Sequence, residues 1–154
     1  MAGNFNPQTA ARALARRLAV QALYRWQLNA APWQDLVSEF ASDADMPRAD
    51  GAYFRALVQQ AVEEHAALDV ALAPFLSRGA ATLDPIEHAV LLIGLFELGQ
   101  CPETPFRVVI NEGVELAKKF GATDGHKFVN AVLDRAARNL RAAEQAATPK
   151  TARR

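Results

Sequence analysis

Four arginines near the start of the chain are the residues best suited to bind an anion. They are Arg12, Arg16, Arg17 and Arg25, and all four lie within the stretch RALARRLAVQALYRWQLN. The first acidic residue of the chain is Asp35. A guanidinium group forks onto phosphate oxygens and also stacks on nucleobases. Because no carboxylate lies near them in the sequence, these arginines are candidates for binding RNA.

The segment that carries them is expected to form an amphipathic helix over about residues 8–29. At roughly 100° per residue, alanines and leucines share one half of this helix, which predicts its core-facing side. Arg16 and Arg17 fall in the other half, together with Tyr24, whose ring is able to stack on a base. Two interpretations stay open from residue types alone. The outer face binds single-stranded RNA, or it is a solvated face whose arginines pair with acidic residues elsewhere in the fold.

The charges are unevenly distributed along the chain although they sum to zero. Residues 1–34 contain four basic residues and no acidic one, and residues 135–154 contain six basic residues and one acidic residue. The middle therefore holds seven of the 17 basic and 16 of the 17 acidic residues. Basic ends around an acidic body favour an anion-binding surface, and the zero sum excludes a bulk polyelectrolyte. End segments are also often basic by chance, so the charge pattern alone does not decide.

The chain lacks the residue patterns of an enzyme or a metal protein. One cysteine, Cys101, allows neither a disulfide framework nor a thiolate cluster, and the three histidines are not spaced as metal ligands. Glycine-rich phosphate loops and nucleophile motifs are absent from the sequence. Glu112 and Glu115 share a helix face and are expected to be solvated acids. We therefore expect no catalytic activity, no cofactor and no metal.

Nothing in the sequence predicts a membrane protein. No segment approaches the roughly 18 apolar residues of a membrane span. The N-terminal residues also lack the apolar core of a signal peptide. A soluble, cytoplasmic protein is the expectation.

Strand signals are nearly absent and prolines stand at segment boundaries, which predicts an all-α fold with seven helices. The fifth helix, in LDPIEHAVLLIGLFELGQ, begins with Asp84 as N-cap and Pro85 in the first helical position. Glu87 stands where a capping-box carboxylate reaches back. Between Ile86 and Leu98 the segment is apolar on all sides, so we expect it to be a buried central helix. The other helices are expected over about residues 8–29, 33–42, 48–64, 66–77, 105–120 and 124–142.

These helices are expected to form one domain, residues 1–142, made of two small bundles that share the central helix. The N-terminal bundle spans about residues 8–78 and the C-terminal bundle about residues 84–142. Gly79 is the expected stop of the fourth helix. Residues 143–154 are expected to form a basic, disordered tail.

The second half of the chain carries a family signature. From Val108, VVINEGVELAKKFGATDGHKFVNAVLDRAAR resembles the pattern of the transcription antitermination factor NusB family, roughly INEAVELAK, then F and G, a short polar cap and KFVNGVLD. ARRLAVQALYRWQL resembles the first helix of the family, and LDPIEHAVLLIGLFEL resembles its LSPIERAVLLIALYEL. Three separated motifs occur in the expected order between about Arg12 and Leu140, which makes the resemblance specific.

The resemblance implies a fold, a function and partners. The family folds as seven helices in two bundles and is not enzymatic. It binds the single-stranded boxA element of nascent ribosomal RNA together with the small-subunit ribosomal protein NusE. The pair joins other Nus factors on RNA polymerase and suppresses termination. Some members are thought to form homodimers that hide the RNA surface, so a homodimer is a further possibility.

The resemblance also implies two sets of site residues. The RNA-facing set combines the basic first helix with a patch at the junction of the last two helices, although Ala13 and Leu14 interrupt the family's denser run of arginines. It consists of Arg12, Arg16, Arg17, Phe120, Asp124, Lys127 and Phe128. The partner-facing set, expected to contact NusE, consists of Tyr24, Phe75 and Glu87.

Three of these residues keep a structural interpretation beside the functional one. Phe128 is equally consistent with core packing, because Val132 and Ala136 continue its helix face. Asp124 is equally consistent with an N-cap of the last helix, and Glu87 with the acid of a capping box. The sequence leaves both interpretations of each residue open.

Two rival functions are also considered. The first is an accessory module of RNA cytosine methyltransferases, which we do not expect because no catalytic domain follows Leu140. The second is a homo-oligomeric helical scaffold that binds no RNA. Salt-dependent, sequence-selective RNA binding separates the antitermination hypothesis from a scaffold, which would show neither property.

Overall fold

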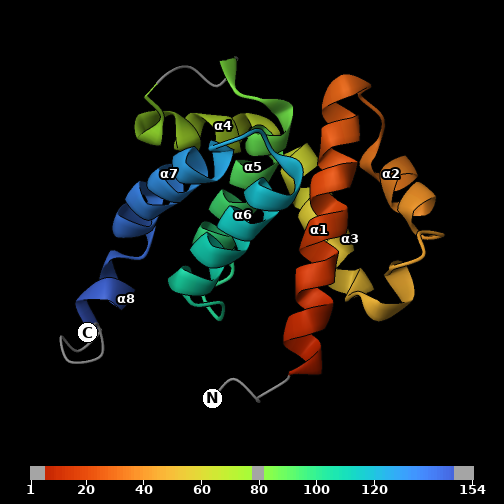
Figure 1. The fold of residues 1–154 in the computed structure, drawn as a ribbon, viewed down its shortest axis with the longest axis horizontal. Coiled ribbons are helices and arrows are strands. Elements are labelled where there is room, and N and C mark those ends of the chain that lie inside the picture. The colour runs from red at the N-terminus through yellow and green to blue at the C-terminus, as the bar shows by residue number, and fades with distance from the viewer. Residues whose placement is uncertain (1–5, 78–81, 148–154) are drawn as a thin grey trace.

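The computed structural model describes residues 6–77 and 82–147, and every regular element within these ranges is a helix (Figure 1). The all-α expectation is therefore confirmed, with one more helix than predicted and two short 3-10 helices, Met46–Arg48 and Ala73–Phe75. The α-helices are α1 (Pro7–Leu28), α2 (Trp33–Phe40), α3 (Gly51–Glu63), α4 (His65–Leu72), α5 (Pro85–Gln100), α6 (Phe106–Phe120), α7 (Gly125–Leu140) and α8 (Ala142–Ala147). The expected stop at Gly79 lies outside the described residues.

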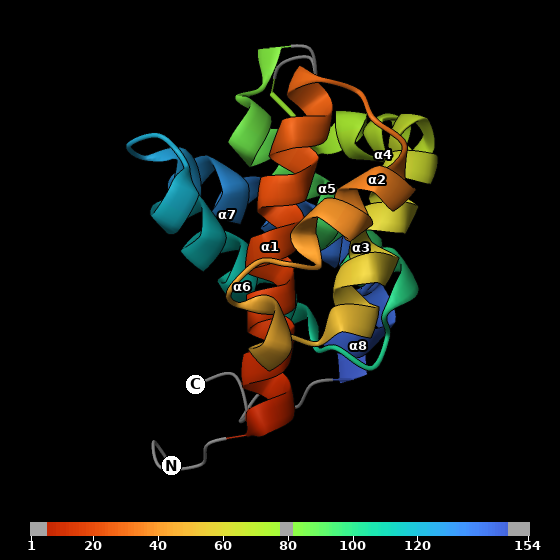
Figure 2. The ribbon, with the colours of Figure 1, turned by 90° about the vertical axis from the view of Figure 1, so that its right-hand side faces the viewer.

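Helix α5 is the central element, as the sequence predicts. It packs against α1, α3 and α4 on one side and against α6 and α7 on the other (Figures 1 and 2). Its start is capped as expected, because the Asp84 carboxylate accepts hydrogen bonds from the backbone N–H groups of Ile86 and Glu87, at 3.1 and 3.2 Å. Ten of its 16 residues are buried. The two groups of helices thus pack against the same, mainly apolar helix, α5.

The start of α1 is fixed by a cap that the sequence analysis did not identify. The side chain of Asn6 accepts hydrogen bonds from the backbone N–H groups of Gln8 and Thr9, at 2.9 and 3.4 Å, and Pro7 occupies the first turn. The cap sets where α1 begins.

Helices α5 and α6 both pack closely against one leucine of α7, Leu133. A Cβ atom added to Gly94 on α5, or to Gly113 on α6, would lie 2.7 Å from the side chain of Leu133 on α7. Leu133 is fully buried. The two glycines therefore let α7 hold α5 and α6 at a fixed spacing, and α6 then faces α1 across the surface described below.

The end of α5 is capped by an arginine from beyond α7. The buried guanidinium of Arg141 donates hydrogen bonds to the carbonyl oxygens of Glu97, Leu98 and Cys101, at 3.1, 2.8 and 2.9 Å. Leu98 is one of the last four residues of α5, whose carbonyls have no partner within a helix. The carbonyls of Glu97 and Cys101 also accept backbone hydrogen bonds, from Cys101 and Thr104. Arg141 also pairs with Glu144, whose carboxylate accepts a hydrogen bond from the backbone N–H of Phe106 at 3.2 Å.

These contacts correct the expectation for the C-terminal tail. Residues 143–147 belong to the short helix α8 and are not a disordered segment. Composition suggested disorder because this stretch is small and polar, while the anchoring partners on α5 and α6 are distant in sequence. The remainder of the expected tail, residues 148–154, lies outside the described residues.

Candidate nucleic-acid interface

Arg16 is an internal residue, which overturns its expected outward orientation. Its side chain is only 4% exposed. The Nε–H group donates to both carboxylate oxygens of Glu97 on α5, at 3.1 and 3.0 Å, and a terminal nitrogen lies 2.9 Å from Oε2 of the same carboxylate. The prediction from helix periodicity was wrong here because a polar side chain can occupy a core position when a buried acidic side chain faces it.

Tyr53 on α3 completes this buried network by donating a hydrogen bond from its hydroxyl group to Glu97. Burial and the neighbouring Glu97 charge raise the pKa of Tyr53, so the phenol stays protonated and remains a donor. Burial by itself lowers the pKa of Arg16, but the hydrogen bond and the charge of Glu97 outweigh it and raise that pKa. The ion pair therefore fastens α1 to α5, and the Tyr53 hydroxyl joins α3 to the same carboxylate.

Arg12 and Arg25 also find partners within the protein. The Arg12 guanidinium lies 4.3 Å from the centroid of the Tyr53 ring and forms ion pairs with Asp50 at 3.6 Å and Glu103 at 3.9 Å. Arg25 pairs with Glu39. The interpretation that the arginines pair with acids elsewhere in the fold is thus correct for Arg12, Arg16 and Arg25.

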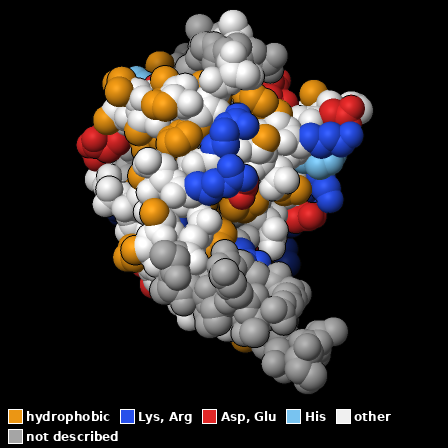
Figure 3. All heavy atoms as spheres, turned by 90° about the vertical axis from the view of Figure 1, so that its left-hand side faces the viewer, with side chains coloured by type: hydrophobic (Ala, Val, Ile, Leu, Met, Phe, Trp, Pro, Cys, Tyr) orange, Lys and Arg blue, Asp and Glu red, His pale blue; other side chains and the backbone are white. Residues whose placement is uncertain are grey.

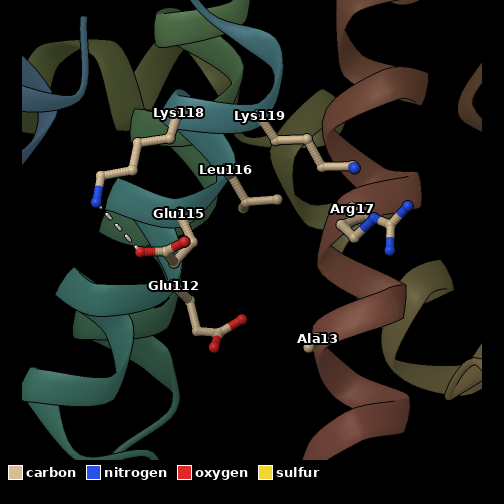
Figure 4. A pocket seen from close by; sticks show the side chains of 7 residues that line it. All are labelled: Ala13, Arg17, Glu112, Glu115, Leu116, Lys118 and Lys119. Atoms are coloured by element: carbon tan, nitrogen blue, oxygen red, sulfur yellow. Dashed lines mark ion pairs between the residues drawn. The ribbon is translucent and has the colours of Figure 1, made fainter. Parts of the chain in front are cut away.

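Arg17 differs from its three neighbours. It lines a groove of about 470 Å³ between α1 and α6, where it projects from α1 (Figure 4). Its Nε atom is enclosed and makes no hydrogen bond to any described residue. The Nε atom of Arg12 also lacks a hydrogen bond, but it lies 3.6 Å from the Asp50 carboxylate, whereas Arg17 forms no ion pair with the described residues. An enclosed guanidinium donor without an acceptor is costly unless a ligand or water supplies one. The groove lining consists of Ala13, Arg17, Glu112, Glu115, Leu116, Lys118 and Lys119.

Two of the basic residues in this groove, Lys118 and Lys119, were missed by the sequence analysis. In Figure 4 Lys119 extends from α6 toward α1, whereas Lys118 turns away from α1 and pairs with Glu115 at 3.6 Å. Lysines in the last turn of a helix are commonly explained by the helix dipole. The sequence signal that could have found them is the aromatic residue that follows them, Phe120. In the structure its ring centroid lies 5.8 Å from the Lys119 ammonium.

A second groove, of about 530 Å³, lies one turn further along α1, where this helix faces the end of α2, the start of α5 and the end of α6. It places Tyr24, from the predicted partner-facing set, beside the same hollow as Phe120, from the predicted RNA-facing set. The structure therefore places one residue of each set on the same groove. The lining consists of Gln21, Tyr24, Arg25, Phe40, Asp43, Ile86 and Phe120.

The junction of α6 and α7 exposes two more residues of the RNA-facing set. Asp124 occupies the N-cap position of α7 with a left-handed backbone (φ 66°), but its side chain makes no capping hydrogen bond. It pairs with Lys127 at 3.3 Å instead. Phe128 is half-buried and packs against the hydrophobic core. Asp124 thus stands at the N-cap position without a capping hydrogen bond from its side chain, and the structural interpretation is supported for Phe128.

The other two partner-facing residues have structural contacts. Glu87 is buried beneath the start of α7, so close that a Cβ atom on Gly125 would overlap its Oε2. The carbonyl oxygen of Phe75 accepts two hydrogen bonds from Arg135 on α7, at 3.1 and 2.6 Å. A role of these residues in partner binding stays a prediction.

Basic side chains also gather on the face that carries α7 and α8 (Figure 3). On α7, Arg135 binds the carbonyl of Phe75 and Arg138 pairs with Asp134. These groups serve contacts within the protein, so we do not include them in the candidate interface.

The described residues contain no group of three or more His, Cys, Asp or Glu side chains placed to hold a metal ion. Both ring nitrogens of His88 have partners, with Gln27 at 3.1 Å from Nδ1 and Asp69 at 2.6 Å from Nε2. None of the described helices has both the length and the apolarity that crossing a membrane requires.

Comparisons with known proteins give one consistent result. The sequence profile of the NusB family matches residues 13–138. The transcription antitermination protein NusB of Thiobacillus denitrificans is 47% identical over 133 residues, which cover 86% of this chain and 92% of that protein. The protein of the same name from Yersinia pestis is 50% identical over 132 residues, covering 86% and 96%.

Two solved structures share the fold. T. maritima NusB superposes with a TM-score of 0.73 at 25% sequence identity, covering 82% of this chain and 90% of that one. A crystal structure of the antitermination factors NusB and NusE in complex with double-stranded RNA contains a chain that superposes with a TM-score of 0.70 at 28% identity. That match covers 84% of this chain and 98% of the other.

Proposed function

The chain belongs to the NusB family, and we propose on this premise that it binds the boxA element of nascent ribosomal RNA and suppresses transcription termination. The observation that carries the RNA part of this proposal is the groove between α1 and α6. There the enclosed Arg17 donor has no acceptor among the described residues, and Lys118 and Lys119 line the same hollow.

The groove has the chemistry of a single-stranded RNA site. Arg17 and Lys119 meet backbone phosphates, which bind guanidinium and ammonium groups. Phe120 and Tyr24, which line the adjoining groove, offer ring faces on which unpaired bases stack. Lys127 supplies a further phosphate contact at the α6–α7 junction, and Asp124 tunes the affinity there.

The proposed protein partner is the small-subunit ribosomal protein NusE. A related NusB chain was solved together with NusE and RNA, which supports this choice. Tyr24, Phe75 and Glu87 are proposed to contact it, and the acidic middle of the chain suits a basic partner. In this proposal the complex then joins other Nus factors on RNA polymerase.

The proposal is tested by fluorescence anisotropy of labelled boxA RNA at two salt concentrations, with and without NusE. A scrambled single strand and a boxA duplex serve as competitors. We expect selective binding to the boxA single strand, strengthened by NusE and weakened by salt. Weak and equal binding to all three RNAs, even with NusE, would overturn the proposal and favour a helical scaffold.

A further inference from the structure

Glu112 is the carboxylate that faces the basic groove most directly. It projects from α6 toward α1, into the hollow lined by Arg17 and Lys119 (Figure 4). Its side chain is 29% exposed, against 69% for Glu115 one turn further along the same helix. The expectation that Glu112 is a solvated acid is therefore wrong, because the groove wall covers most of its side chain.

The position of Glu112 is set from inside the protein. A terminal nitrogen of Arg16 lies 3.5 Å from its Oε1. Arg16 is itself held by hydrogen bonds to both oxygens of Glu97. A carboxylate backed by a fixed, buried cation has already lost much of its rotational freedom, so a ligand that it binds need not order it.

A carboxylate in a phosphate-binding groove needs an explanation, because it repels the backbone of the strand. An ionised carboxylate only accepts hydrogen bonds, so its ligand in the groove must be a donor. The donors of an unpaired RNA strand are the N–H and amino groups on its base edges and the 2′-hydroxyl groups of its riboses. Only the base edges differ between nucleotides, and amino groups of bases are known partners of acidic side chains. The surrounding Arg17, Lys118 and Lys119 keep the strand close while the carboxylate meets a base.

We propose that Glu112 accepts a hydrogen bond from the amino group of one nucleobase and thereby selects the base at one position of the bound strand. Guanine suits it best, because an N–H group and an amino group lie side by side on its Watson–Crick edge and fit two carboxylate oxygens. Uracil carries no amino group and is disfavoured. Arg16 is the positioning residue behind this contact. The inference rests on the proposed function.

The test is a set of RNAs in which each amino-bearing base of the boxA strand is replaced, one at a time, by uracil. Wild-type protein with NusE is expected to lose roughly 5- to 100-fold in affinity at the position that Glu112 contacts. Glu112→Gln is expected to abolish the discrimination at that one position and leave the others unchanged. Glu115→Gln is the matched control, and we expect it to discriminate as the wild type does.

A guanine-to-inosine replacement at the same position removes only the amino group. Wild-type protein is expected to lose affinity for this RNA, and Glu112→Gln is expected to bind both RNAs equally. The inference is overturned if Glu112→Gln keeps every base preference, or if it changes affinity by one factor for all RNAs. If wild-type protein shows no base preference at all, the proposed function fails together with this inference. A selective wild type with an unaltered variant refutes the inference alone.

The role of Arg16 needs a readout that a lost phosphate contact would not give. Arg16→Met is expected to weaken the discrimination at the Glu112 position while the slope of log affinity against log salt stays that of the wild type. Arg17→Ala should lower that slope by about 0.7, as expected for one phosphate contact with a single strand. If Arg16→Met does not fold, the Glu112→Gln series decides. A lower salt slope in a folded Arg16→Met variant would contradict the positioning role.

Discussion

Arg16 and Arg17 are neighbours in the sequence, yet they belong to two regions of opposite character. Arg16 lies in a buried network, where its charge is matched by Glu97 and its pKa is raised. Arg17 lies in an open groove, where its enclosed Nε atom has no acceptor among the described residues. The difference shows that residue type and helix position do not determine the role of an arginine. Its role is determined by the carboxylates that the fold brings beside it.

The largest expected effect concerns the buried network. Glu97→Ala leaves the guanidinium of Arg16 buried without its main partner and removes the acceptor of Tyr53, so we expect a loss of about 3–5 kcal/mol in the free energy of unfolding. Urea denaturation followed by circular dichroism measures it. Glu39→Ala, which breaks the exposed pair with Arg25, is the control and should cost less than about 1 kcal/mol. Equal costs would mean that the network does not hold α1 in place.

The groove is expected to respond in the opposite way. Arg17→Ala should lower the free energy of unfolding by no more than about 0.5 kcal/mol, because its guanidinium serves no essential internal contact. Its affinity for boxA RNA should fall, and anisotropy titrations over a range of salt concentrations should show the smaller slope given above. A destabilised variant with unchanged RNA affinity would reverse the roles of the two regions.

A smaller difference is expected between the two lysines of the groove. Lys119→Ala should weaken RNA binding more than Lys118→Ala, because Lys119 extends toward α1 and Lys118 is already paired with Glu115. Both variants remove one positive charge from the same turn of α6, so each controls for the other. Equal losses would indicate that the groove attracts RNA by its net charge and not by placed contacts.

The smallest expected effect concerns Glu112, which lies between the buried network and the groove. Burial raises the pKa of Glu112 above its ordinary value of 4.5, because its cost and the charges of Glu97 and Glu115 outweigh the attraction of Arg16. A carboxyl group whose pKa is higher in the folded state than in the unfolded state stabilises the folded protein at a pH below its unfolded-state pKa. This stabilisation is lost as the pH rises through the folded-state pKa. The wild type should therefore lose stability relative to Glu112→Gln as the pH rises above the ordinary glutamate pKa of 4.5. A gain over this range would show that Arg16 dominates.

The sequence predicted the elements better than the contacts between them. Asp84, Pro85 and the apolar run after them define α5, because capping and burial are local signals. The inward turn of Arg16 could not be predicted, since its partner Glu97 is 81 residues away. One signal was present, namely a single acid within the otherwise apolar segment LLIGLFELG. A buried acid requires a buried cation, and pairing the two would have assigned Arg16 correctly.

The site was predicted in part for a similar reason. Family resemblance pointed to Arg17, Phe120 and Lys127, which the structure places on grooves or on the surface. Lys118 and Lys119 were missed because the last turn of a helix offers a sufficient local explanation for basic residues. Helix α8 was missed because its anchor, Arg141, caps a helix that ends some 40 residues earlier.

The most direct test of the distinction between the two arginines is to observe their side chains without mutation. In ¹⁵N-labelled protein, NMR detects the Nε–Hε group of each arginine during titration with boxA RNA in the presence of NusE. We expect the Arg16 signal to exchange slowly with water and keep its position, because Glu97 already accepts its hydrogen. The Arg17 signal should shift and become protected when RNA binds. A large shift of Arg16 with no change at Arg17 would contradict the division between buried network and RNA groove.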